Sequence, residues 1–212
     1  MKKIIISTIL LGAVCLSGCI TKDTYTVTKE EYEECCTFES YLPKMNSLNF
    51  TVKYKESNGN KVYEAITKFD NGKIYSSTGN SEFYVIYKEG TYNSTANTWT
   101  IDYIWDNEGA WNKETVENVK MPDDVFLPTV SDVYGFDDLT FNAETNYYEQ
   151  IEEDKVLNGN YHYSEGKIKF LNGNVVYISY KYKADYSPND VYLTELEVVD
   201  YGTTEVIIPN VN

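Results

Sequence analysis

Hydrophobic and polar residues alternate with a period of two along most of the chain. This is the period of a β-strand, because successive side chains of a strand point to opposite faces of its sheet. Two segments show the alternation most clearly. The large apolar residues that would share one face are Leu48, Phe50, Val52 and Tyr54 in the first segment and Trp99, Ile101, Tyr103 and Trp105 in the second. The pattern predicts a sheet with one apolar face and one solvated face.

Short turns separate the predicted strands. The sequence Asp70-Asn71-Gly72 is typical of a tight hairpin, because asparagine and glycine tolerate the positive φ angles that such turns need. Consecutive strands joined by short turns form an antiparallel meander. We expect strands over residues 48–105, again over residues 141–199, and a last one over residues 205–208.

A helix is predicted before the first strand. Thr28 and Glu31 match a capping box, in which the hydroxyl caps one free amide and the glutamate reaches back to another. The helix should cover residues 29–42, and Pro43 should end it.

Residues 106–139 interrupt the strand pattern. They include Pro122 and Pro128 and apolar clusters without a clear period. A polar linker would lack these apolar groups, so we expect an irregular insertion with one short helix. The predicted fold class is therefore mainly β, of the α+β type. It consists of one domain over residues 29–212 with a curved antiparallel sheet and an N-terminal helix.

Residues 1–18 have the layout of a secretory signal peptide. Lys2 and Lys3 precede a short apolar run that ends in small residues, and the run is shorter than the roughly 20 residues that a membrane-spanning helix needs. The sequence Leu16-Ser17-Gly18-Cys19 resembles the lipobox of bacterial lipoproteins. That resemblance implies that Cys19 becomes the acylated first residue of the mature chain.

An acylated Cys19 would make residues 19–28 a lipidated tether to the membrane. The protein would then lie on the extracytoplasmic face of a bacterial cell membrane, or of the outer membrane where the host has one. Acyl chains in pairs give stable attachment without a transmembrane helix. The alternative is an ordinary signal peptide in which Cys19 is incidental.

The overall charge of the chain argues against nucleic acid as a binding partner. The chain has a formal net charge of −15 and contains no arginine. Nucleic acid is not expected as a partner, because its phosphates would be repelled.

Residues that could perform catalysis or bind a metal are sparse. His162 is the single histidine, and the chain has no nucleophile elbow, P-loop or dinucleotide-binding fingerprint. Acidic pairs such as Asp123-Asp124 lack the spacing of a calcium loop, so we expect solvated loop charge there. The sequence predicts no enzyme, no cofactor and no metal site.

Cys35 and Cys36 are adjacent in the predicted helix. They could form a strained disulfide with each other, pair with another chain, or pack as small apolar residues. One adjacent pair is not a disulfide framework, so packing is the favoured interpretation.

Two stretches of the sequence resemble segments found in a family of carrier proteins. They are "VYEAITKFDNGKIYSSTGNSEFYVIYKEG" at residues 62–90 and "ELEVVDYGTTEVIIP" at residues 195–209. With the order of the predicted elements, they resemble the LolA and LppX-like lipoprotein carriers. The resemblance implies a half-barrel sheet closed by helices around an apolar cavity that carries acyl chains. The chain lacks the arginine that holds the helical lid in some members, which sets it apart from carriers of lipoproteins.

Two functions are therefore expected. The first is non-enzymatic binding of a lipid or another hydrophobic ligand, with the eight alternating apolar residues of the two strands named above as the lining. The second is a display module that binds a protein or glycan through exposed aromatic residues, with a packed core. The interior of the folded domain distinguishes them, because only the carrier needs a lined hollow.

Overall fold

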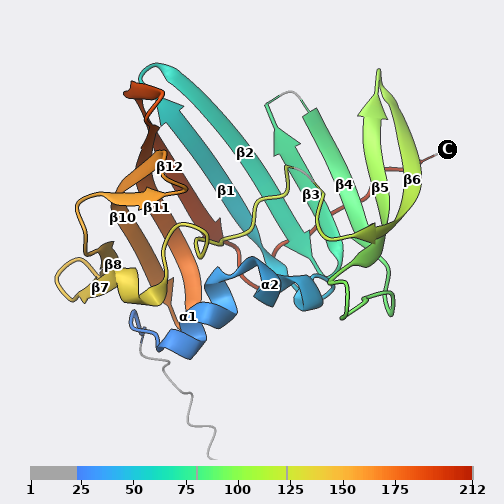
Figure 1. Ribbon diagram of the computed structural model, residues 1–212. Helices are drawn as coiled ribbons and strands as arrows, with labels where there is room; N and C mark the ends of the chain where they lie inside the picture. The colour runs from blue at the N-terminus through green and yellow to red at the C-terminus, as the bar shows by residue number, and fades with distance from the viewer. Residues whose placement is uncertain (1–22, 80, 123, 212) are drawn as a thin grey trace, which may run out of the picture.

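The computed structural model describes residues 23–79, 81–122 and 124–211. The predicted signal peptide, Cys19 and the first part of the predicted tether lie outside the described residues. Within the described part, twelve strands form one antiparallel sheet that is curved and not closed into a barrel (Figure 1). The prediction of a mainly β fold is confirmed.

The sheet consists of two meanders that meet in its middle. The strands of the first are β1 (Asn49–Asn58), β2 (Lys61–Asp70), β3 (Lys73–Thr78), β4 (Ser81–Tyr87), β5 (Trp99–Asn107) and β6 (Ala110–Val119). The strands of the second are β7 (Leu139–Asn142), β8 (Tyr147–Gln150), β9 (Lys155–Leu157), β10 (Tyr161–Leu171), β11 (Asn174–Ala184) and β12 (Ser187–Val199). The order across the sheet is β6-β5-β4-β3-β2-β1-β12-β11-β10-β8-β7, and β9 pairs with β10. β1 pairs with β12, so the first and last strands of the chain join the two meanders into one sheet.

The N-terminal helical region begins where the sequence predicts. The amide of Glu31 donates to Thr28 Oγ1 at 3.2 Å, and the amide of Thr28 donates to Glu31 Oε2 at 2.7 Å. Both bonds of the capping box are therefore present at the start of α1 (Lys29–Cys36). Of the helices in the described part, none combines the length and the apolar composition that crossing a bilayer requires.

The predicted single helix over residues 29–42 is wrong, because it breaks at Thr37. Thr37 has extended φ and ψ angles, and the chain continues as α2 (Phe38–Tyr41) and the 3-10 helix η1 (Leu42–Lys44). The carbonyl of Cys36 accepts hydrogen bonds from the amides of Val130 and Ser131, at 3.1 and 3.3 Å. Tertiary contacts thus take the carbonyl at the end of α1 that helix continuation would have used.

The segment predicted as irregular contains a strand. β6 pairs with β5 through a hairpin in which Glu108 and Gly109 both have positive φ. None of its residues is buried, so it lacks the hydrophobic alternation from which strands are predicted. Residues 124–135, called here the crossing segment, then pass over the inner face of the sheet and lead to the 3-10 helix η2 (Phe136–Asp138) (Figure 1).

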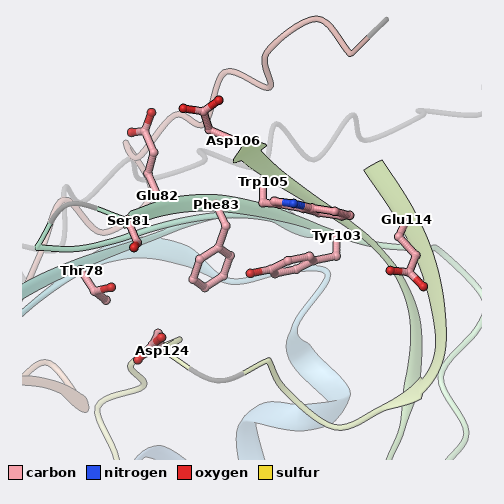
Figure 2. A pocket seen from close by; sticks show the side chains of 9 residues that line it. All are labelled: Thr78, Ser81, Glu82, Phe83, Tyr103, Trp105, Asp106, Glu114 and Asp124. Carbon is pink, nitrogen blue, oxygen red and sulfur yellow. The ribbon is translucent and has the colours of Figure 1, made fainter. Parts of the chain in front are cut away.

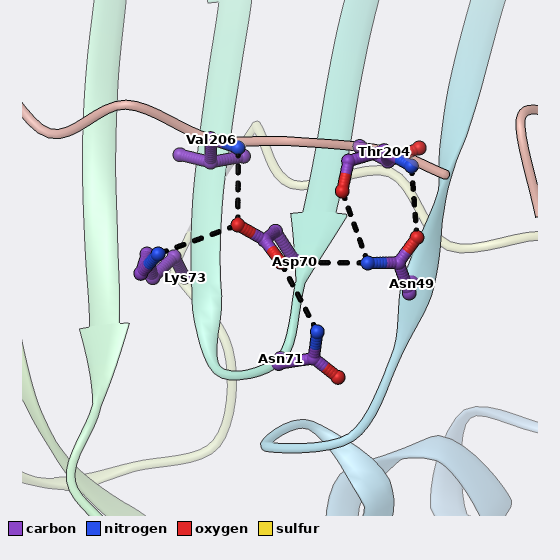
Figure 3. A network of polar contacts seen from close by, with 6 residues as sticks. All are labelled: Asn49, Asp70, Asn71, Lys73, Thr204 and Val206. Atoms are coloured by element: carbon purple, nitrogen blue, oxygen red, sulfur yellow. Dashed lines mark hydrogen bonds and ion pairs between the residues drawn. The ribbon is translucent and has the colours of Figure 1, made fainter. Parts of the chain in front are cut away.

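The chain after β12 does not form the strand predicted over residues 205–208. It runs across the outer face of the sheet behind the strands of the first meander (Figure 1). Side chains rather than a β-ladder hold it: Asn49 bonds to the backbone of Thr204, and Asp70 to that of Val206 (Figure 3). The apolar residues at 205–208 therefore belong to a segment that packs across the strands, and they do not mark a paired strand.

The core lies between the inner face of the sheet and the layer formed by α1, α2, η1 and the crossing segment. The side chains that fill it include Tyr32, Leu42, Met45, Phe69, Ile74, Tyr134, Ile168, Phe170 and Ile178. The indole of Trp99 is buried in this core, and its Nε1 donates to the carbonyl of Leu42 at 2.7 Å. The end of the predicted tether also packs on this domain, because the hydroxyl of Tyr148 bonds to both the amide and the carbonyl of Val27.

Candidate functional site

The structure divides the eight predicted lining residues into two groups. Five of them have exposed fractions of 9% or less: Leu48, Phe50, Val52, Trp99 and Ile101. All five belong to the core cluster that also contains residues of α1, α2 and the crossing segment. The protein's own helices and loops therefore cover this part of the predicted lining.

The other three, Tyr54, Tyr103 and Trp105, lie further along the same strands and are partly exposed. Tyr54 stacks on Phe126 of the crossing segment, with ring centroids 4.3 Å apart. Tyr103 and Trp105 instead line an open cleft. The alternation correctly placed all these side chains on the inner face, but it could not show where the covering layer ends.

The cleft lies between the ends of strands β3 to β6 and the crossing segment (Figure 2). Its volume is about 510 Å³. The residues that line it are Thr78, Ser81, Glu82, Phe83, Tyr103, Trp105, Asp106, Glu114 and Asp124. This is the size range of pockets that bind small molecules.

Three aromatic rings form the sheet side of the cleft. Phe83 is paired in register with Trp105, and Tyr103 lies two residues away on the same face of β5. The rings of Tyr103 and Trp105 are stacked, with centroids 5.5 Å apart and an angle of 28° between their planes. Phe83 lies 5.2 Å from Tyr103 and is buried at the back of the cleft. The result is a continuous aromatic surface that only Tyr103 and Trp105 expose in part.

Two carboxylates border this aromatic surface from opposite sides. Glu114 extends from β6, where it is paired in register with Tyr103, and Asp124 extends from the crossing segment (Figure 2). Glu82 and Asp106 point to the other side of their strands from Phe83 (Figure 2). Within the described part of the chain, neither Glu114 nor Asp124 forms an ion pair with a lysine.

The wall that carries Asp124 is fixed to the sheet. Ser76 Oγ donates to the backbone carbonyl of Asp124 at 2.5 Å, and the amide of Phe126 donates to Thr67 Oγ1 at 3.1 Å. Ser76 and Thr67 are both fully buried on the inner face. The acidic pair that the sequence predicted as solvated loop charge thus supplies, through Asp124, an exposed carboxylate at a fixed position on the rim of the cleft.

A second aromatic group lies on the other half of the inner face. Tyr163, Tyr182 and Tyr192 are paired in register across β10, β11 and β12, and their rings are stacked 6.0 and 5.0 Å apart. Glu56 Oε2 accepts hydrogen bonds from Tyr182 at 2.9 Å and from Tyr54 at 3.1 Å. Burial and this carboxylate raise the pKa of Tyr182, so it donates as a neutral phenol.

The remaining candidates for chemistry serve the fold. The sulfurs of Cys35 and Cys36 lie 3.8 Å apart and share a hydrogen bond, not a disulfide bond, and Cys36 is fully buried. Burial raises the pKa of the Cys36 thiol, which makes it unreactive. His162 bridges Asp154 and Asp185 at 2.7 and 2.9 Å. Among the described residues no group of three or more metal-ligating side chains is placed to hold a metal ion.

Comparisons with known proteins give the chain no family. No family model matches it, and no curated protein matches it. Among solved structures it is similar to a DUF1329 family protein from Desulfovibrio piger, with 10% sequence identity and a TM-score of 0.24. That comparison covers 82% of this chain and 92% of the other. A similarity of this degree assigns neither a family nor a ligand.

Proposed function

We propose that this chain is a lipid-anchored extracytoplasmic binding protein, without enzymatic activity, that holds a small ligand in the cleft of Tyr103 and Trp105. One observation carries the proposal. The protein's own helices and crossing segment cover much of the inner face, and beyond this cover, at the ends of β3 to β6, a stacked aromatic pair borders an open space of about 510 Å³.

The lining indicates the chemistry of the ligand. Stacked rings favour a ligand with a flat apolar surface, because burying aromatic area against such a surface is their main contribution. The hydroxyls of Thr78 and Ser81 and the carboxylates of Glu114 and Asp124 would bind its polar groups. A neutral sugar or a compact organic cation fits this lining.

A free fatty acid fits the cleft less well. Its carboxylate would lie near Glu114 and Asp124, and like charges repel. The apolar residues that could bury an acyl chain, such as Phe50 and Val52, are covered by the protein itself. Carriage of an acyl chain would require that the helical layer move away, whereas the cleft is open to a ligand without such a movement.

Attachment to the membrane is the second part of the proposal, and it rests on the lipobox-like sequence at Cys19. Metabolic labelling with radioactive palmitate in a bacterial host tests it. The full-length chain should incorporate label and fractionate with membranes, whereas Cys19→Ser should do neither. Equal fractionation of the two proteins without label would contradict lipid attachment.

Binding is tested with a library of neutral glycans, organic cations and fatty acids, followed by the amide spectra of the domain from residue 23 onward. At least one glycan or cation should shift the resonances of Tyr103 and Trp105, and Trp105→Leu should abolish the shifts. Trp111→Leu is the matched control, because Trp111 packs on Tyr84 on the other side of the sheet. If only fatty acids bind, or if ligands bind Trp105→Leu as well as the wild type, the cleft is not the site.

A further inference from the structure

We infer that the ligand of this cleft carries a positive charge on an alkylated nitrogen. The inference rests on the proposed function and specifies the substrate class of the same site. Its basis is the combination of a stacked aromatic surface with carboxylates on two sides of one cleft.

The aromatic rings supply the first part of the argument. The face of an aromatic ring carries negative electrostatic potential and attracts a cation, and indole does so more strongly than the other rings. Trp105 and Tyr103 carry stacked rings at the cleft, and Phe83 lies next to Tyr103 (Figure 2). Aromatic surfaces of this kind bind quaternary ammonium groups, whose methyl groups also bury apolar area.

The carboxylates supply the second part. Glu114 and Asp124 approach the aromatic surface from opposite sides, so a cation on Trp105 would lie between two negative charges (Figure 2). The lining contains no lysine that would neutralise them. The net charge of −15 adds a long-range attraction for cations. A neutral sugar would stack on the rings and donate hydroxyl hydrogen bonds to the carboxylates, but it would leave both negative charges uncompensated.

Comparison with other parts of the same molecule supports this interpretation. At several other aromatic rings in the described part of the chain, a lysine of the protein itself supplies the cation. The pairs are Lys68 over Tyr75, Lys155 over Tyr134, and Lys169 over Tyr25 and Tyr147, at 5.3 to 5.8 Å from the ring centroid. The buried carboxylate of Asp102 likewise has Lys88 and Lys113 as partners. In the described part of the chain, no lysine lies over Trp105 or Phe83, and a cationic ligand would occupy that position.

Choline and its uncharged carbon analogue, in which carbon replaces the quaternary nitrogen, test the inference directly. The two probes have nearly the same shape, so their affinity ratio isolates the charge. Titration followed by tryptophan fluorescence or calorimetry should show choline binding about tenfold more tightly, the combined effect of a cation on an indole ring and two partly exposed carboxylates. Raising the salt concentration should reduce that ratio.

Charge-removing variants identify the groups responsible. Glu114→Gln and Asp124→Asn should each weaken choline binding about two- to fivefold and leave the neutral analogue unchanged. Glu117→Gln is the matched control, since it removes the same charge from β6 outside the cleft. Both replaced carboxylates are exposed, so the variants should fold, and circular dichroism checks that they do.

The outcomes separate the inference from the proposed function. Equal affinities for the two probes, or a glycan that binds the cleft while choline does not, would overturn the cationic ligand and leave the binding function intact. Loss of choline binding in Glu117→Gln to the same degree as in Glu114→Gln would overturn it also. If no member of the library binds at Trp105, the proposed function itself fails.

Discussion

Asp70 Oδ2 accepts a hydrogen bond of 3.1 Å from the backbone amide of Val206, joining the end of β2 to a segment 136 residues further along the chain (Figure 3). The neighbouring Asn49 bonds to both the amide and the carbonyl of Thr204, at 2.9 and 3.0 Å. Burial alone would raise the pKa of Asp70, but the bonds from Val206 and Asn71 and the charge of Lys73 outweigh it and lower that pKa. Asp70 and Asn49 thus bind backbone groups of the C-terminal segment on the outer face, as the backbone of a neighbouring strand would.

Replacement of Asp70 by alanine should release this segment. The free energy of unfolding should fall by about 1 to 3 kcal/mol, because the amide of Val206 loses a charged acceptor and the side chain of Asn49 loses a neighbour. Hydrogen exchange should accelerate at the amides of residues 204–208 and stay unchanged in β4. A variant with wild-type exchange at Val206 would show that packing, not Asp70, holds the segment.

Asp102 should determine how the protein responds to acid. Its carboxylate is buried on the outer face and contacts Lys113 at 2.8 Å, Lys88 at 3.0 Å and Thr115 at 2.7 Å. Burial raises its pKa, but these three partners outweigh burial and lower the pKa to about 2. An unfolded aspartate has a pKa of about 3.9, so the stabilisation is complete above that pH and is lost as the pH falls towards 2.

Asp102→Asn should therefore remove about 1 to 2 kcal/mol of stability at neutral pH and flatten the acid limb of the stability curve. Urea unfolding at a series of pH values between 2 and 7 measures both effects. Asp132→Asn is the control, because Asp132 is exposed and should change neither. If the two variants have the same pH dependence, the ion pairs of Asp102 contribute nothing net.

Most of the sheet could be predicted from the sequence because one physical rule governs it. A strand with one buried face carries apolar residues at every second position, as β1 does with Phe50 and Val52, β4 with Phe83, Val85 and Tyr87, and β5 with Trp99, Ile101 and Tyr103. β6 was not predicted because it is an edge strand without a buried residue. Its position depends on pairing with β5, which the local sequence does not show. Residues 205–208 show the converse error, since they were predicted as a strand and form none. Their apolar residues belong to a segment that crosses the strands. A local pattern does not show whether a segment runs along the strands or across them.

The candidate site was predictable only in part, for a related reason. Tyr103 and Trp105 belong to a strand whose inner face is apparent from the alternation. Which residues of that face are covered depends on where α2 and the crossing segment lie, and these contacts span the whole chain. Asp124 has no local signal, because its position follows from bonds between the crossing segment and the buried hydroxyls of Thr67 and Ser76.

His162 should make stability depend on pH in the opposite sense to Asp102. Its ring nitrogens contact Asp154, which precedes β9, and Asp185, which follows β11. The hydrogen bond to Asp154 raises its pKa; burial opposes this, and Asp185 adds to the rise. A raised pKa means that the stabilisation is complete below about pH 6.5 and is lost as the pH rises through the folded-state value.

The unfolding temperature of the wild type should therefore decline between about pH 6 and 8 through this residue, and His162→Gln should remove that part of the decline. Because His162 is the single histidine, its ring resonances report the folded-state pKa without ambiguity. A measured pKa at or below 6.5 would contradict the clamp between the two aspartates. Asp154→Asn should lower the measured pKa more than Asp185→Asn.

Thr67 should position the wall of the cleft without touching a ligand. Its hydroxyl accepts the amide of Phe126, so Thr67→Val keeps the shape of the side chain and leaves that amide unpaired. Stability should fall by about 1 to 3 kcal/mol, and exchange at the amide of Phe126 should accelerate. Affinity for a cleft ligand should fall as well, because the start of the crossing segment, which carries Asp124, would keep its bond to Ser76 and lose its bond to β2. Thr51→Val is the matched control, since Thr51 is equally buried but bonds to Thr204 on the outer face. It should lose a similar amount of stability and keep wild-type affinity; equal losses of affinity in both variants would mean that global loosening, not the position of the crossing segment, controls binding.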